Sequence, residues 1–516
     1  MMEKAINFIK EKNLLYLIIG SVFGIFSISQ FNIGISIYIW PFCFLRYLHI
    51  SESKLIPTLI VSICILVVNL LRWIHFAEMS VISDILFSLY FGALNLIPFL
   101  VDIIFYKNVK KWKSVFIFPL FMAFFDYLNS EIPVANHNMY AYAIRADIQY
   151  LQIISLFGGY FMTFMIALFA TILDYSIDLY KKDKKISIFI YIYISLVIII
   201  YFFGMIRMLA HADGEKINIS SVTGISQYPA DNDFENEGFL NMSEYLDYIN
   251  KTMKIAKDAH SQIINYAEEA FFIDSKEDKE EIINKTCEYA KYYSIFVVLS
   301  IDYYGDEKGA INEALLISDD GEILYDYHKQ NLIPKMESEY YEDLDELKVI
   351  DTKYGRISIV ICYDINFPNF INSLGKKHID LLFAPAWDWD SIAEWHSNDA
   401  RYRAIEGGFN LIKNTANGII ITTDDRGRAL TYFIARDNED YNVVSTLRIK
   451  GSKTLYSYIC EFFNYFYLVA LILVLTLDKI IEWYKLKKLK ARQSDITYKK
   501  VQQQLNDLIL DENENI

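Results

Sequence analysis

The sequence has 516 residues, of which 53% are hydrophobic and 16% aromatic, and its formal net charge is −15. The apolar content exceeds that of ordinary soluble proteins and predicts membrane segments, whereas the negative charge argues against nucleic-acid binding, which needs a basic face. The five cysteines, an odd number without CxxC spacing, offer neither a disulfide framework nor a zinc site.

Apolar runs long enough to suggest helical membrane spans recur along the chain. Crossing the hydrocarbon core takes roughly 20 mostly apolar residues. Eight runs approach this length, and the second and fifth are the shortest. They cover residues 14–30, 33–47, 55–71, 79–106, 115–128, 148–173, 186–209 and 456–477. The first run ends without a small-residue cleavage site and is therefore not expected to be a signal peptide.

Basic residues in the short connections indicate the orientation of these spans. Lysines precede the first span, fill alternate loops and follow the last span, whereas the other loops are poor in Lys and Arg. By the positive-inside rule, both termini are expected in the cytoplasm and the large polar segment outside it. The resulting prediction is a multi-pass membrane protein with its large polar segment extracytoplasmic.

Four regions follow from this pattern. Residues 1–209 are expected to form a membrane domain of about seven helices, and 210–455 an extracytoplasmic α/β domain. Residues 456–477 are a last span, and 478–516 a polar cytoplasmic tail with a short helix and a frayed end. Short apolar strands such as "GRISIVICYD" and "IDLLFAPAWD" alternate with helical patterns such as "HSNDARYRAIEGGF". Strands that are apolar on both faces favour a buried sheet flanked by helices.

Three residues at strand ends are candidates for chemistry. Cys362 ends the apolar strand "RISIVIC", where α/β proteins bind ligands, and a thiol there can be a nucleophile if a neighbour activates it. Lys329 follows an alternating strand and could stabilise an oxyanion. Glu268 follows "QIINYA" and could act as general base, although Glu269 beside it is equally placed. Taken alone, Cys362 fits a small core residue equally well, Lys329 fits a solvated surface lysine better, and Glu268 also fits a surface acid at a strand end.

Together these residues resemble the nitrilase or carbon–nitrogen hydrolase superfamily. The order is a glutamate, then "Y-x-K-x-x-L-x-P-x-x-E", then a strand ending in "C-Y" and an acid. The downstream segment "HSNDARYRAIEGGFNLIKNTANG" is similar to further elements of that family. Its matching residues are His396, Arg403, Ala404, Glu406, Asn417 and Gly418. The resemblance implies an α-β-β-α sandwich for the outer domain.

A nitrilase-like domain between membrane spans resembles the apolipoprotein N-acyltransferase family in particular. "FPLFMAFFDYLN" is similar to a membrane motif of that family, with Asp126 at the place of its acid and Asn129 replacing an Arg. The resemblance implies Glu268 as base, Cys362 as the acylated nucleophile and Lys329 as oxyanion stabiliser. The positions implied to bind substrate or support the site are Glu337, Asn312, Tyr363, Asp364, Trp387 and Trp389.

Several positions depart from the family pattern. The family's W-P-E is "YAE" here, P-F-G-E is "PKME" and C-Y-E is "CYD", and Lys413 stands where an Arg is usual. The three catalytic residue types are retained. The departures therefore bear on the substrates more than on the type of reaction.

The implied reaction moves an acyl chain from a phospholipid, through a thioester on Cys362, to the free amine of a diacylglyceryl-modified lipoprotein. The implied partners are these two lipid substrates and the bilayer; nucleic acid, metal and organic cofactors are not expected. Two alternatives remain at this point. A membrane-tethered amidase or nitrilase-type hydrolase would use the same residues with water as acceptor, and a non-catalytic binding module would have lost the activity.

Overall fold

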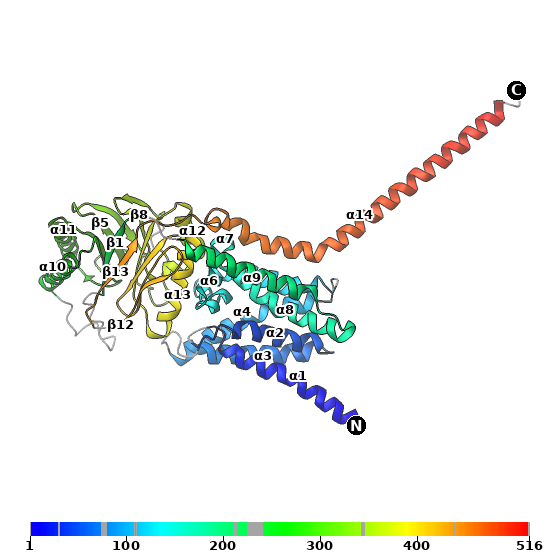
Figure 1. Cartoon of the computed structure of the whole chain (residues 1–516), viewed down its shortest axis with the longest axis horizontal. Coiled ribbons are helices and arrows are strands. Elements are labelled where there is room, and N and C mark those ends of the chain that lie inside the picture. Colours follow the sequence, from blue (N-terminus) through cyan, green and yellow to red (C-terminus); the bar gives the residue numbers. More distant parts are fainter. Residues whose placement is uncertain are drawn as a thin grey trace.

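The computed structural model describes residues 2–28, 31–73, 80–107, 109, 111–210, 214–223, 241–341, 346–436 and 439–513; only the backbone is described for 2–13, 135, 137, 491–492, 494–499 and 502–513. A bundle of helices lies beside an α/β domain, and the C-terminal helix leaves the bundle on the far side (Figure 1). Gln30, Met79 and residues 211–213, which fall in predicted spans or at the predicted start of the outer domain, lie outside the described residues.

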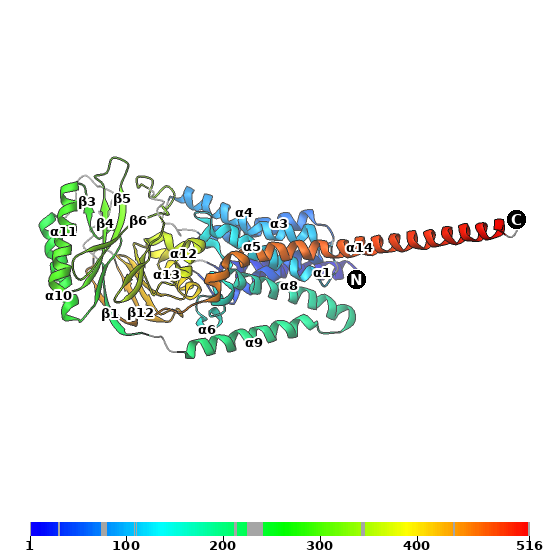
Figure 2. The ribbon, with the colours of Figure 1, turned by 90° about the horizontal axis from the view of Figure 1, so that it is seen from above.

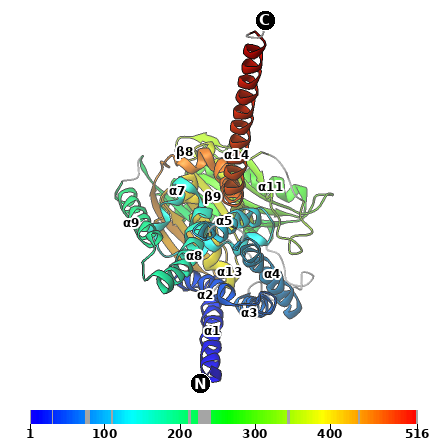
Figure 3. The same cartoon turned by 90° about the vertical axis from the view of Figure 1, so that its right-hand side faces the viewer.

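The helical part precedes the α/β domain in the chain. Its helices are α1 (Met2–Ile25), α2 (Ser36–Ile50), α3 (Leu55–Trp73), α4 (Val81–Phe105), α5 (Ile117–Ser130), α6 (Ile148–Leu151), α7 (Ile154–Phe157), α8 (Gly159–Asp183) and α9 (Ile188–Leu209). Viewed end-on, α2, α5 and α8 lie between α9 on one flank and α3 and α4 on the other (Figure 3). A single large apolar cluster fills the space between them.

Five helices among the described residues are long and apolar enough to cross a membrane: α3, α4, α8, α9 and the first part of α14 (Leu455–Asn513). Four of these helices coincide with predicted spans, and α8 overlaps part of the predicted span 148–173. The other three predicted runs contain shorter apolar helices. These are the Leu14–Ile25 part of α1, the 15-residue α2, and α5 within the apolar stretch Ser114–Ser130.

The prediction of one span over residues 148–173 is wrong. The chain bends through α6 and α7, and only at Gly159 does the long helix α8 begin, which then continues to Asp183. The break lies at Gly158, whose φ of +75° suits glycine. A Cβ there would lie 2.3 Å from the ring of Tyr456, so the residue also allows the close approach of α14.

The α/β domain contains two sheets packed face to face between pairs of helices, as the fold class predicts. One sheet has the order β13-β1-β2-β4-β5-β6, with β3 paired to β4, and the other has the order β12-β11-β10-β9-β8-β7. In the first sheet the strands are β1 (Lys216–Val222), β2 (Ile263–Tyr266), β3 (Phe272–Ile273), β4 (Phe296–Tyr303), β5 (Ile311–Ile317), β6 (Ile323–His328) and β13 (Asn442–Arg448). In the second they are β7 (Ile350–Thr352), β8 (Gly355–Ile359), β9 (Leu381–Ala386), β10 (Asn410–Thr415), β11 (Gly418–Thr423) and β12 (Ala429–Ala435).

The outer helices complete an α-β-β-α sandwich. Figure 2 shows α10 (Met242–Asp258) and α11 (Lys276–Tyr293) on the face turned away from the helical bundle. On the other side, α12 (Pro368–Lys376) and α13 (Asp390–Gly407) lie between the second sheet and the bundle (Figure 2). The core between the sheets is apolar on both inner faces, for example Ile219 and Val298 facing Ile359 and Leu382.

Helix α14 differs from the predicted short span and tail. It continues from Leu455 to Asn513, with non-helical backbone angles at Ile459 marking a kink near its start. The predicted polar tail is therefore a continuation of the last apolar helix as far as Asn513.

Candidate active site

Strand ends from both sheets converge on one buried cluster. Glu268 lies two residues beyond β2, Lys329 directly follows β6, and Cys362 lies three residues beyond β8. All three side chains are almost fully buried, between 1% and 4% exposed. This is the edge where the carboxyl ends of parallel strands meet, the usual place for ligands in α/β proteins.

Glu268 is held by three donors. Its Oε1 accepts from the Lys329 Nζ and from Asn312 Nδ2, both at 2.8 Å. Its Oε2 accepts from the backbone N–H of Trp387, also at 2.8 Å. Both oxygens therefore face donors, which suits a charged carboxylate in a fixed orientation. The hydrogen bond from Lys329 identifies Glu268 as the glutamate that joins the lysine.

Lys329 bridges two carboxylates. Its ammonium contacts Glu268 and also Glu337, which in turn accepts from the Ile333 N–H at 2.6 Å. Burial by itself lowers the pKa of Lys329, but the charges of Glu268 and Glu337 outweigh it and hold the pKa well above its usual value. Lys329 is therefore a permanent positive charge within the cluster.

The surroundings of Cys362 favour the protonated thiol. Burial and the charge of Glu268 raise its pKa well above the usual range, while the Lys329 ammonium acts in the opposite direction. Because the thiolate is the nucleophilic form, this cysteine needs a base at the moment of attack. Glu268 is the carboxylate with the strongest electrostatic influence on it.

The backbone at Cys362 is strained. Its φ is +46°, a left-handed conformation that non-glycine residues rarely adopt and that often occurs at functional sites. Cys362 is the first residue of the short 3-10 helix Cys362–Asn366, which makes a sharp turn after the strand. Surrounding contacts must hold this conformation.

Asp364 supplies four of these contacts. Its Oδ2 accepts from the Tyr327 hydroxyl at 2.6 Å and from the Ile361 N–H at 3.0 Å. Its Oδ1 accepts from the backbone and side-chain N–H groups of Asn331 at 2.8 and 2.9 Å. The residue is fully buried, so it ties the nucleophile turn to the segment that carries Lys329.

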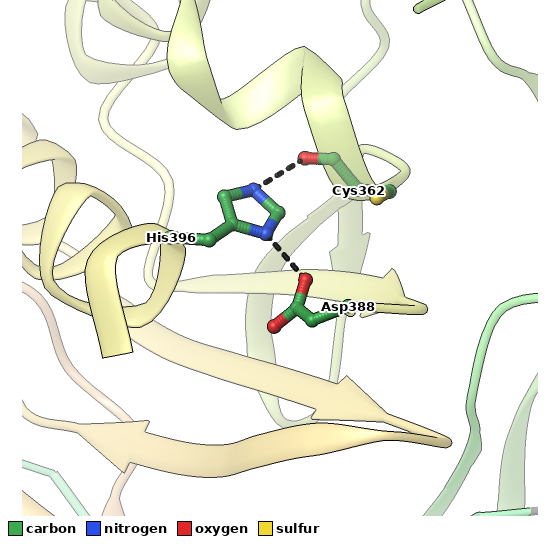
Figure 4. Close-up of side chains that lie close together, drawn as sticks. All are labelled: Cys362, Asp388 and His396. Atoms are coloured by element: carbon green, nitrogen blue, oxygen red, sulfur yellow. Dashed lines mark hydrogen bonds and ion pairs between the residues drawn. The ribbon is translucent and has the colours of Figure 1, made fainter. Parts of the chain in front are cut away.

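A second buried group holds the same turn from the other side. Figure 4 shows the His396 ring between the Cys362 carbonyl, at 3.2 Å, and Asp388 Oδ1, at 2.7 Å. The other Asp388 oxygen contacts the Lys413 ammonium. Burial raises the pKa of Asp388, but Lys413 and His396 outweigh it and lower the pKa below its usual value.

Cys362, Asp388 and His396 also lie close enough together to be considered as metal ligands. Both His396 nitrogens and both Asp388 oxygens are already engaged by the contacts described above. The arrangement therefore fits a hydrogen-bonded support for the nucleophile better than a metal centre.

The remaining predicted residues lie around the cluster in different ways. Trp387 is half-buried, and its backbone N–H donates to Glu268. Trp389 is 8% exposed and packs in the apolar cluster of the helical bundle. The Tyr363 hydroxyl donates to Asn136 Oδ1 at 3.1 Å and accepts from the Val134 N–H at 2.7 Å, so it contacts the bundle loop after α5.

The matches to known proteins agree with this geometry. Residues 252–444 match the family model described as carbon–nitrogen hydrolase. The chain carries a carbon–nitrogen hydrolase domain. This domain is what the strand-end Glu, Lys and Cys predict, together with the two-sheet sandwich.

Relatives of the carbon–nitrogen hydrolase domain fall into two groups. Nitrilase homolog 2 of Dictyostelium discoideum is 26% identical over 258 residues, 48% of this chain and 71% of that protein. Apolipoprotein N-acyltransferase of Rickettsia typhi is 22% identical over 351 residues, 63% of this chain and 68% of that protein. The match to the Vibrio cholerae apolipoprotein N-acyltransferase is 29% identical and covers only 32% of its length.

Among solved structures, an amidase of the nitrilase superfamily from Nesterenkonia AN1 is similar, with a TM-score of 0.40 and 17% identity. The matched region covers 46% of this chain and 92% of the amidase.

The Rickettsia typhi match extends beyond the hydrolase domain, since 351 residues exceed the 193 positions of the family match.

Proposed function

We propose that this protein is an apolipoprotein N-acyltransferase, which moves an acyl chain from a phospholipid to the N-terminal amine of a diacylglyceryl-cysteine lipoprotein. The observation that carries the proposal is the position of the nucleophile. Cys362 lies beside the buried Glu268–Lys329 pair, and the next residue, Tyr363, contacts the loop of a membrane helix bundle. A cysteine held at that boundary is within reach of lipid substrates.

In the first step, Glu268 takes the thiol proton as Cys362 attacks the ester carbonyl carbon of a phospholipid. The carbonyl oxygen becomes an oxyanion, and the Lys329 ammonium stabilises it. When the tetrahedral intermediate collapses, the carbon–oxygen ester bond breaks. The proton on Glu268 passes to the departing alkoxide, which leaves as lysophospholipid, and a thioester remains on Cys362.

In the second step, the amine of the lipoprotein attacks the thioester carbon, and Glu268 takes a proton from the attacking nitrogen. The carbon–sulfur bond then breaks, an amide forms, and the thiolate regains its proton. A thioester reacts readily with amines but is lost to water, so the nearly complete burial of Cys362 favours transfer over hydrolysis.

The neighbouring residues support these steps. Asn312 and the Trp387 N–H orient Glu268, while Glu337 holds Lys329 from the opposite side. Asp364 positions the nucleophile turn from within the domain, and Tyr363 joins it to the bundle. We assign Trp387 and Trp389 to the walls that receive substrate.

The chain's placement follows from the same proposal. Residues 1–209 and 456–477 would lie in a bacterial cell membrane, with 210–455 outside and 478–516 in the cytoplasm. Because both substrates are lipids, a site at the bilayer surface avoids extracting acyl chains from it, which costs about 0.8 kcal/mol per CH₂.

A membrane-tethered amidase is the second candidate. It is favoured by the match to Nitrilase homolog 2, which is 26% identical over 258 residues and covers 71% of that protein. In this case water would discharge the acyl-enzyme, and the donor would be a soluble amide rather than a lipid.

Mass spectrometry of the intact protein separates the two. The full chain in detergent is mixed with phospholipid, and then a diacylglyceryl lipopeptide is added, with Cys362→Ser as the control. Acyl mass on Cys362 that moves to the lipopeptide amine supports the transferase. Discharge by water alone supports the hydrolase, and a cysteine that never acylates with phospholipid refutes the lipid donor.

A further inference from the structure

A cationic cavity lies at the foot of the hydrolase domain, away from the nucleophile. It has a volume of about 380 Å³ and is lined by residues of β1, β13 and the hairpin that joins β11 to β12. Lys216, Arg428 and Arg448 contribute positive charge, and Asp424 is the acidic lining residue. None of the residues assigned to the proposed reaction lines it.

The cavity is separated from the reaction site by the length of the sheet. Lys216 opens β1, whereas Val222 at the other end of that strand pairs with Tyr266, two residues before Glu268. Six residues of extended strand at about 3.3 Å each span roughly 20 Å. The cavity therefore is a separate place for a ligand.

The positive charge in the cavity is only partly compensated. Lys216 and Arg448 are directly opposite in the antiparallel β1–β13 pair, so their side chains leave the same face of the sheet. Like charges in that arrangement repel each other and destabilise the pair. The Arg448 guanidinium also donates to the Gly214 carbonyl at 2.8 Å, which leaves its charge in place.

Asp424 cannot neutralise all three cations. Its Oδ2 pairs with Arg428 Nε at 2.9 Å. Its Oδ1 accepts from the backbone N–H groups of Arg426 and Arg428 at 3.0 and 2.9 Å, which closes the hairpin. The lining thus keeps a net charge of about +2 from three cations and one acid, which favours an anion.

The cavity lies where the last span before the domain ends. Arg428 donates to the carbonyl of Ala210, the residue that follows α9, at 3.1 Å. Arg207, in the last turn of α9, donates to the Asp425 carbonyl of the same hairpin at 3.3 Å. Figure 2 shows this end of α9 beside β1 and β12. The final α9 residue, Leu209, is 71% exposed, as expected for a side chain that faces lipid.

We propose that this cavity binds the phosphate group of an anionic phospholipid in the leaflet next to the hydrolase domain. Phosphate is the anion found at this depth of a bilayer, and the exposed Leu430 beside the cations offers contact to the lipid's apolar part. Bound lipid would fix the height of the domain over the membrane. The site does not depend on the proposed acyl transfer.

Native mass spectrometry of the full chain in detergent tests the proposal, in a Cys362→Ala background that prevents turnover. Phosphatidylglycerol, phosphatidylcholine and inorganic phosphate are titrated separately. We expect tighter binding of phosphatidylglycerol, and a loss of about fivefold in affinity for each cation removed at a membrane surface. Lys216→Gln should lose about fivefold, and Lys216→Gln with Arg448→Gln about 25-fold.

A matched control removes two exposed lysines from the outer helices, Lys251→Gln with Lys285→Gln, and should bind as the parent does. Lys216→Gln relieves a like-charge pair, so its melting temperature without lipid should not fall. Equal binding by the cavity variants and the control overturns the site. Inorganic phosphate binding as tightly as phosphatidylglycerol overturns the lipid ligand.

Discussion

Replacing Asp364 by asparagine tests whether the nucleophile turn is held as described. Asparagine has one acceptor oxygen, so its NH₂ group must face one of the two pairs of donors that Asp364 now accepts from. Two hydrogen bonds to a charged acceptor are lost, worth roughly 1.5–3 kcal/mol each. Burial raises the pKa of Asp364 more than these donors lower it, so the buried charge itself is unfavourable. Removing that charge therefore offsets part of the free energy lost with the two hydrogen bonds.

The net expected destabilisation of Asp364→Asn is about 3 kcal/mol. For a domain of this size it corresponds to a fall in melting temperature of roughly 6–12 °C. Tryptophan fluorescence during thermal unfolding of the full chain in detergent would measure it, since the Trp387 carbonyl lies 3.7 Å from Cys362 Sγ. Acylation of Cys362 should slow in the same variant.

Two companion variants calibrate this result. Tyr327→Phe removes a single donor to Asp364 and should cost about 1–2 kcal/mol. Asp364→Glu adds one methylene, moves the carboxylate by about 1.5 Å in a filled site, and should cost about 1–3 kcal/mol. If Asp364→Asn melts within about 1 °C of the parent, or if the glutamate variant is more stable, the four contacts do not hold the turn as argued.

Three further outcomes follow from the site. The charge of Glu337 raises the pKa of the Cys362 thiol, and the charge of Lys329 lowers it. At pH 8, iodoacetamide should therefore alkylate Cys362 about tenfold faster in Glu337→Gln and about tenfold slower in Lys329→Met. Rate changes in the same direction for both variants would contradict this. Burial and nearby acids raise the folded-state pKa of Asp302, so its ionisation weakens the fold as pH rises above about 4. The stability advantage of Asp302→Asn should accordingly be larger at pH 8 than at pH 5, and calorimetry showing the reverse trend would refute it. Tyr363→Phe removes the hydroxyl contact to the bundle loop. It should slow acyl transfer about tenfold, which corresponds to a rise of about 1.4 kcal/mol in the activation free energy. An unchanged transfer rate would show that this contact is dispensable.

Local signals in the strands were sufficient to predict a buried α/β sheet, whereas the two-sheet sandwich was implied by the resemblance to the carbon–nitrogen hydrolase superfamily. The segments "GRISIVI" and "DLLFAPA" are mostly apolar, and β8 and β9 lie within them. Functional side chains placed directly after such strands must lie along one edge of a sheet. Strand-end positions made Glu268, Lys329 and Cys362 candidates one by one, and the family resemblance grouped them into one site.

Contacts between distant segments could not be anticipated in the same way. The contact between Tyr363 and Val134 joins residues 229 positions apart, and no local pattern marks either as a partner of the other. The ion pair of Asp388 with Lys413 was hidden for the same reason. The choice of Glu268 over Glu269 rests on the contacts of Glu268 with Lys329, Asn312 and Trp387, which periodicity does not reveal.

The break at Gly158 shows a different limit. Hydropathy sums over residues 148–173 see one continuous apolar run, because α6, α7 and α8 are all apolar. What divides them is the packing of Gly158 against Tyr456, almost 300 positions later in the chain. Hydropathy therefore gives the length of an apolar segment but does not show where its helix axis changes direction.

Helix α13 belongs as much to the bundle as to the sandwich. Trp395, Tyr402 and Ile405 lie in the apolar cluster of the membrane helices. The Tyr402 hydroxyl donates to the Ala141 carbonyl at 2.5 Å, and Glu406 accepts from the Gly159 N–H at 2.6 Å. Expressing the hydrolase domain alone would therefore expose the apolar face of α13 to solvent and favour aggregation. A chimera with a relative's bundle would have to exchange α13 and the loop after α5 together.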